Sequence, residues 1–325
     1  MKSSPFARYF FVICVGAALL AGCSGGPLLP AGTSNAAAYP DQSQSWMAPE
    51  AKKEDLLYVS DINTYDVYVY AYPKGKLVGT LTNQNNPAGL CVDKKGNIFV
   101  TQLYGGGHIV EYAHGGTTQL ESLSDPGYEP GGCSVNFKTG TLAVSNIIND
   151  YFDVGDLLIY KDAKGSPKVI QAPPQSASGG VWGSVNTCGY DDKGNIFIAG
   201  HGYPDANVFG EVPKGASNMI NITLNQDFGN GIGNVQWDGK HITFAGIDGS
   251  IYAFTMKGSQ GTEVGSTILN GSNQVDQGWI QGSTVIAPQQ YGAEVLYYKY
   301  PAGGNKTRAV SEASAPFGTT VSLAK

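Results

Sequence analysis

The chain has 325 residues, of which 14% are charged, and its 20 Lys and Arg against 26 Asp and Glu give a formal net charge of −6. This acidic balance argues against nucleic acid as a partner, because binding to phosphates needs clustered Lys and Arg, and the sequence contains no such cluster. Its 45 glycines and 19 tyrosines favour short strands joined by tight turns over helices.

The first 22 residues have the pattern of a signal peptide. Lys2 and Arg8 precede an uncharged run that ends at Leu20, which is shorter than the ~20 apolar residues that a membrane-spanning helix needs. The sequence Leu20-Ala-Gly-Cys23 resembles the lipobox of bacterial lipoproteins, in which the cysteine is acylated and becomes the first residue. The resemblance predicts lipidation of Cys23, and loss of Lys2 and Arg8 would leave the mature chain with a charge of −8.

Residues 23–54 are predicted to form a lipidated, flexible tether, because they are rich in Ser, Gly, Ala and Pro and lack apolar periodicity. Ser24 follows the lipidated cysteine at a position where Asp, in well-studied Gram-negative bacteria, favours retention in the inner membrane. We therefore expect the domain to lie in the cell envelope outside the cytoplasm, at the outer membrane rather than the inner. The lipid anchor is its only expected contact with the membrane.

A repeat organises the rest of the chain. The segment that begins Pro87-Ala-Gly-Leu-Cys-Val is an apolar strand, followed by a turn at Gly96 and a second apolar strand. The same plan recurs around Gly140, Gly194, Gly239 and Gly282, at spacings of 44, 54, 45 and 43 residues. Third strands with alternating apolar residues are predicted at 67–72, 109–112, 157–160, 208–212, 251–254 and 295–300. A period of about 40–50 residues with several strands per repeat is typical of propeller blades.

The first repeat lacks its first strand, since the tether leads directly into a second-strand sequence at Asp55–Asp61. The C-terminal segment Pro316-Phe-Gly-Thr-Thr-Val has the same Pro-x-Gly-x-x-Val spacing as the segment at Pro87, so it is expected to complete the first blade. The predicted fold is thus an all-β, six-bladed β-propeller over residues 55–325, with the ring closed by the C-terminal strand. A sandwich of regular hairpins is the alternative.

The repeats resemble blades of the NHL-repeat and SMP-30/gluconolactonase superfamily, above all at 87–100 and at 192–198. In the lactonases of that superfamily an axial divalent metal is held by a Glu of the first blade and by Asn and Asp at later inner strands. Here Ala315-Pro-Phe-Gly318 offers no Glu, and only Asn186 has a ligand type in register, with Glu129 and Asp276 nearby. We expect no cofactor; a metal-dependent hydrolase with a divalent cation remains the alternative.

Three cysteines, Cys91, Cys133 and Cys188, fall in the predicted propeller, and no two of them form a CxxC pair. Outside the cytoplasm, one disulfide and one thiol are the natural count. Cys133 and Cys188 occupy equivalent positions on adjacent inner strands, so they are expected either to form a disulfide or to pack as buried thiols. The four histidines fall in no metal-binding or nucleophile motif.

Propeller geometry predicts which loops share a face. Loops that join the second to the third strand lie on the same side as the links between blades, and here both are long and varied, whereas the opposite turns are short. We call this side the long-loop face and expect it to bind. Its candidate residues are Tyr104, His108, Tyr128, Glu129, Asn149, Tyr151, Asp153, Trp182, His201, Tyr203, Asp205, Asp276 and Tyr291.

The predicted function is that of a monomeric, non-enzymatic binding domain. Aromatic rings provide contact area and amide and carboxylate groups provide orientation, which suits a small molecule, a glycan or a protein partner. Besides the hydrolase, the other alternative is a scaffold for envelope assembly.

Overall fold

The structure is a computed structural model that describes residues 44–325 except 105, 150–152, 205–206 and 230, so Cys23 and the signal sequence lie outside it. The described part is all-β, as predicted, and its helical elements are two short 3₁₀ turns, η1 (Pro49–Lys53) and η2 (Lys161–Ala163). None of the helices described here is long and apolar enough to cross a membrane.

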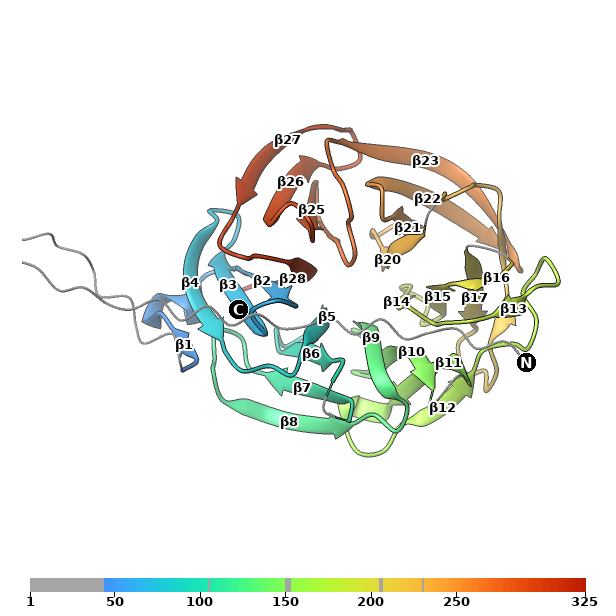
Figure 1. Cartoon of the computed structure of the whole chain (residues 1–325), viewed down its shortest axis with the longest axis horizontal. Helices are drawn as coiled ribbons and strands as arrows, with labels where there is room; N and C mark the ends of the chain where they lie inside the picture. The colour runs from blue at the N-terminus through green and yellow to red at the C-terminus, as the bar shows by residue number, and fades with distance from the viewer. Residues whose placement is uncertain (1–43, 105, 150–152, 205–206, 230) are drawn as a thin grey trace, which may run out of the picture. The chain divides into compact units, whose positions relative to one another are not determined.

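The strands form antiparallel units that follow one another along the chain (Figure 1). The first unit contains, from inside outwards, β28 (Pro316–Ser322), β2 (Leu56–Asp61), β3 (Asp66–Ala71) and β4 (Lys76–Leu81). The second contains β5 (Pro87–Val92), β6 (Ile98–Gln102), β7 (His108–Tyr112) and β8 (Gln119–Ser124). The third contains β9 (Tyr128–Val135), β10 (Leu142–Asn149), β11 (Asp153–Tyr160) and β12 (Lys168–Gln171).

The later units are built in the same way. The fourth contains β14 (Thr187–Tyr190), β15 (Ile196–Gly200), β17 (Val208–Val212) and β18 (Ile220–Asn221). A nine-stranded sheet holds two more units. The fifth contains β20 (Ile232–Trp237), β21 (Ile242–Gly246), β22 (Ser250–Lys257) and β23 (Gln260–Asn270). The sixth contains β24 (Trp279–Gln281), β25 (Thr284–Gln289), β26 (Glu294–Lys299) and β27 (Gly303–Val310). The two units meet where β23 pairs in parallel with β27.

The glycines that mark the repeat lie in the turns between the first and second strands. Gly96, Gly140, Gly194, Gly239 and Gly282 all have φ between 58° and 99°. Only glycine adopts this left-handed region without steric cost. Glycine therefore recurs in the sequence because each of these turns needs a residue with positive φ.

The C-terminal strand completes the first unit, as predicted. β28 pairs antiparallel with β2, and Leu57 lies opposite Val321. The boundary at residue 54 was wrong, because β1 (Trp46–Met47) pairs with β4 on the outer edge of this unit and η1 follows it. Residues 46–53, which the composition assigned to the tether, therefore form regular structure.

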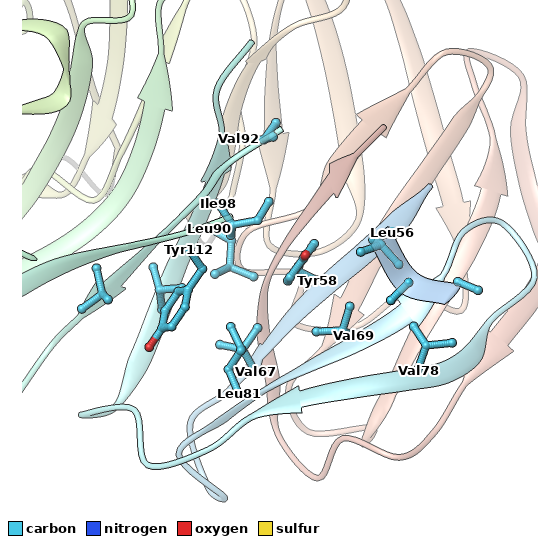
Figure 2. Close-up of a cluster of buried hydrophobic side chains, with 14 residues drawn as sticks. Leu56, Tyr58, Val67, Val69, Val78, Leu81, Leu90, Val92, Ile98 and Tyr112 are labelled. Carbon is cyan, nitrogen blue, oxygen red and sulfur yellow. The ribbon is translucent and has the colours of Figure 1, made fainter. Parts of the chain in front are cut away.

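Apolar side chains fill the space between neighbouring units. Figure 2 shows one such cluster, in which Leu56, Tyr58 and Val69 of the first unit face Leu90 and Ile98 of the second. The last unit packs against the first in the same way, through a cluster that contains Leu57, Val59, Ile286, Val295 and Tyr297. Each sheet is therefore apolar on both faces, which explains why the second strands are continuous apolar runs.

Hydroxyl groups on second strands join the innermost strands of neighbouring units. Ser60 Oγ accepts from the Gly318 N–H at 2.8 Å and donates to the Ala88 carbonyl at 2.6 Å. Thr101 Oγ1 accepts from the Gly89 N–H and donates to a carbonyl of β9. These bonds satisfy buried backbone groups at the centre, where the inner strands of different units do not form a regular ladder.

The disulfide links Cys91 on β5 to Cys133 on β9, and Cys188 is a buried free thiol. The proposed Cys133–Cys188 disulfide was therefore wrong, although Cys188 does pack as a buried thiol. Cys133 and Cys188 are equivalent, so both face the preceding unit and lie in different clusters. Cys91 is offset by one residue, and because side chains alternate along a strand it faces forward, toward Cys133.

Candidate functional site

Exposed tyrosines mark the loops between second and third strands. These loops are three to seven residues long and the opposite turns two to seven, so the expected difference in length between them was wrong. Tyr104, Tyr203 and Tyr291 are 62%, 78% and 77% exposed, and they follow β6, β15 and β25 in the second, fourth and last units. Tyr65, between β2 and β3, is 49% exposed and was missed by the sequence analysis. Alignment of the repeats could have identified it, since Tyr65 occupies the equivalent loop of the first unit.

These loops lie on one side of the molecule. The inner strands run in the same direction, as the parallel bridge between Gln277 and Gly318 shows for the last and first units. Strands alternate in direction within each unit, so the second-to-third loops lie at the end where the chain enters the inner strand. The structure thus brings three of the predicted tyrosines to the predicted face.

In the third unit, the backbone places three predicted residues beside one another. Asn149 on β10 lies opposite Tyr128 on β9 and opposite Asp153 on β11. Tyr151 and Asp205 lie outside the described residues. The end of this unit on the long-loop face therefore combines three polar residue types across three strands.

Trp182 does not belong to the exposed face, and this prediction was wrong. The ring is 1% exposed and packs in the core between the third and fourth units, and its Nε1 donates to Asn221 Oδ1 at 2.9 Å. The reason is local pairing, because Val181–Trp182 forms strand β13 opposite β16 (Gly202–Tyr203). This pairing leaves Tyr203 exposed and turns Trp182 inward.

His201 is exposed on the same loop, and a Cβ built on Gly231 would lie 3.2 Å from its Cε1. His108 is half-buried at the start of β7, where its Nδ1 is buried without a hydrogen-bond partner. The Glu129 backbone N–H donates to Asn146 Oδ1 at 3.1 Å, which fixes the start of β9. His201 and His108 thus belong to different units and do not form one cluster.

Asp276 is the most perturbed carboxyl on this face. Burial raises its pKa to about 6, and the Gln274 amide, which donates to Oδ1 at 3.0 Å, offsets only part of that effect. Its Oδ2 is buried without a hydrogen-bond partner. The side chain is therefore partly protonated near neutral pH.

Two of the residues considered for a lactonase-like metal are engaged within their own segments. Asn186 Oδ1 accepts a hydrogen bond from Ser184 Oγ at 2.5 Å, and Asp276 Oδ1 is bonded to Gln274. Among the described residues, no group of three or more His, Cys, Asp or Glu side chains is arranged to hold a metal ion. A hard cation needs several converging oxygen ligands, so these residues give no support for the hydrolase alternative.

Comparisons with known proteins agree on fold and leave function open. No family model matches the chain, and no curated protein matches its sequence. A solved chain of a nidogen/laminin complex is similar over 83% of this chain and 99% of its own, with a TM-score of 0.63 and 11% identity. The periplasmic gluconolactonase of Pseudomonas aeruginosa is similar over 83% of this chain and 99% of its own, with a TM-score of 0.54 and 14% identity.

A third structure, a functionally unknown protein from Desulfotomaculum acetoxidans, is similar over 84% of this chain and 100% of its own, with a TM-score of 0.57 and 10% identity. At such low identities the likeness concerns the fold alone. The chain thus has an all-β, propeller-type fold, which proteins as different as a nidogen/laminin complex chain and a gluconolactonase share.

Proposed function

We propose that this protein is a non-enzymatic binding domain of the cell envelope, and that its long-loop face recognises a neutral polysaccharide. The observation that carries the proposal is the exposure of Tyr104, Tyr203 and Tyr291 on loops of three different units. A tyrosine ring combines a flat apolar face with a polar hydroxyl, as recognition of a sugar ring requires. Side chains at such exposure gain little stability from burial in the folded chain.

The spacing of the tyrosines favours a polymer over a compact protein partner. The three rings come from alternate units, so they are distributed around the face. A specific protein interface buries about 1,200–2,000 Å² around a contiguous core, whereas an extended chain can contact separated rings one after another. The acidic chain, at −6 overall, disfavours an anionic polymer.

We further propose that the domain is a closed six-bladed β-propeller. One unit in the five-stranded sheet, three in four-stranded sheets and two in the nine-stranded sheet give six. The pairing of β28 with β2 and the apolar cluster between the last and first units support closure. A closed ring presents its second-to-third loops in a fixed arrangement, which the proposed recognition requires.

The proposed anchor is acylated Cys23, which would hold a monomeric domain at the outer membrane. Its support is the lipobox-like segment alone. In cells, replacement of Cys23 by Ser should release the protein from washed membranes or leave it uncleaved. Retention of a cleaved variant in membranes after a salt wash would contradict the anchor.

Binding is tested with the purified full chain carrying Cys23→Ser, by affinity electrophoresis through gels that contain a neutral β-glucan or a galactomannan. Retarded migration is expected, and Tyr203→Ala and Tyr291→Ala should weaken it several-fold with an unchanged melting temperature. Lys95→Ala and Lys164→Ala, in short turns on the opposite face, are the matched controls and should bind normally. Migration unaffected by either polysaccharide would overturn the proposed ligand class.

A further inference from the structure

A cavity of about 260 Å³ lies on the face opposite the long loops, where the inner strands end in their short turns. We call it the axial cavity. It is lined by residues of β5, β9, β14, β20 and β24 and by the turns after β9 and β14. Five units therefore contribute to its wall, and its residues do not overlap the candidate residues of the long-loop face.

The inner end of the axial cavity is lined by buried residues, two of which form the disulfide. The disulfide partners Cys91 and Cys133 and the amide of Gln277 line it, and all three are at most 5% exposed. Close backbone contact continues from there, because a Cβ at Gly89 would lie 2.3 Å from the Gly131 carbonyl oxygen. Phe137, which also lines the cavity, is 54% exposed.

The amide groups in the wall are already engaged. Gln277 Oε1 accepts from the Leu90 N–H, and its Nε2 donates to the Leu90 carbonyl. Gln236 makes the same pair of bonds with the backbone of Ile280, at 2.7 and 2.9 Å. A ligand that needed hydrogen bonds from these amides would first have to break bonds that join different units, so a strongly polar ligand is disfavoured.

The charges at the rim already have partners in the turns after β9 and β14. The Asp191 carboxylate accepts bonds from the backbone N–H groups of Lys193, Gly194 and Asn195 and from the Asn195 side chain. The Lys138 ammonium donates to the backbone carbonyl of Asp192. A bound anion would face two nearby carboxylates, and a bound cation would face the Lys138 ammonium, so neither charge meets a rim of purely opposite sign.

What the wall does offer is aromatic surface from consecutive units. Phe137, Tyr190, Trp237 and Trp279 come from the third, fourth, fifth and sixth units. Tyr190, Trp237 and Trp279 are half-buried, so part of the surface of each residue remains accessible to a ligand. Large aromatic side chains around a buried apolar floor are the lining of sites for small molecules, although this volume is below the usual ~300–1,000 Å³.

We propose that the axial cavity is a second binding site, which takes a small, flat and uncharged aromatic molecule. The site is independent of the long-loop face and of the polysaccharide proposed there. The ligand enters from the short-turn side, and its ring rests against the disulfide and Trp237. The site holds no catalytic constellation and acts by binding alone.

Three probes with one ring system and different charges test the proposal by ligand-observed NMR on the full chain carrying Cys23→Ser: 2-naphthol, 2-naphthoate and 2-naphthylmethylammonium. At pH 7, 2-naphthol should bind at one site per chain and at least tenfold more tightly than either charged probe. Equal or tighter binding of a charged probe would overturn the ligand class, and absence of 2-naphthol binding would overturn the site.

Variants then locate the bound probe. Trp237→Phe preserves an aromatic core residue, and Phe137→Ala removes an exposed ring, so both variants should fold. Both should weaken 2-naphthol binding several-fold, and Tyr291→Ala on the long-loop face should leave it unchanged. Unchanged affinity in both cavity variants would overturn the assignment. Because Tyr291→Ala tests the other face, failure of the polysaccharide proposal would be distinguished from failure of this one.

Discussion

The side-chain amide of Gln277 forms hydrogen bonds in both directions with the backbone of Leu90, 2.7 Å from Oε1 to the Leu90 N–H and 3.2 Å from Nε2 to its carbonyl. Gln277 precedes β24 in the last unit, and Leu90 belongs to β5 in the second. One side chain therefore reaches past β28 and joins two units that are not neighbours in the chain order.

Gln277→Ala should lower the free energy of unfolding by about 1–3 kcal/mol, because it leaves a buried N–H and a buried carbonyl of Leu90 without partners. Chemical denaturation measures the loss. Gln260→Ala, at an exposed position on β23, is the matched control and should change stability by less than about 0.5 kcal/mol. Equal effects of the two substitutions would show that the Leu90 bonds add nothing.

Reduction of the Cys91–Cys133 disulfide should destabilise the fold by about 4 kcal/mol, since the bond closes a loop with a sequence separation of 42. The melting temperature with and without reductant measures the effect. Cys188→Ala should leave the response to reductant intact. Alkylation of the denatured, unreduced protein should label Cys188 and spare the other two; a label on Cys91 or Cys133 would exclude the pairing.

Asp276 should make stability depend on pH. Its folded pKa is about 6 because of burial, above its ordinary value of 3.8, so its protonated form favours folding. That contribution is complete below about pH 4 and is lost as the pH rises through about 6. Asp276→Asn should therefore flatten the pH profile in this window and raise stability at pH 7.5 by at most about 3 kcal/mol. An unchanged profile in the variant would contradict the assignment.

Deletion of residues 316–325 should destabilise the whole domain, because it removes β28 from the first unit and with it the partner of Ser60 and of β2. The loss should exceed the usual 0.5–3 kcal/mol of a point mutation. Thermal melting of the truncated chain measures it. A melting temperature within a few degrees of the intact chain would refute closure by the C-terminal strand.

The sequence was sufficient for the units because each turn requires a glycine at positive φ and each strand is an apolar run. It was insufficient where tertiary pairing decides. The two-residue strand Trp46–Met47 is too short for any periodicity, and it is ordered only because β4 is beside it. The sequence around Trp182 predicts a loop, because it contains no pattern that indicates the pairing of β13 with β16.

The disulfide shows a different limit. Alignment of the inner strands makes Cys133 and Cys188 equivalent. Equivalent residues face the same way, whereas a disulfide between neighbouring units needs residues that face each other. The axial cavity was missed for a similar reason. Its aromatic residues are dispersed over about 140 positions of the sequence, and only the arrangement of the units brings them to one wall.

The parallel pairing of β23 with β27, and the covering of β4 by β1, have a consequence for encounters between copies of this protein. Along these paired stretches, the backbone N–H and C=O groups of β4, β23 and β27 already form hydrogen bonds. A strand from a second molecule therefore cannot pair there. Among the described sheets, β8, β12 and β18 end without such a cover, and of these β8 and β12 carry exposed apolar side chains, Leu120 and Val169. At high concentration, edge-to-edge aggregation should therefore begin at these two strands.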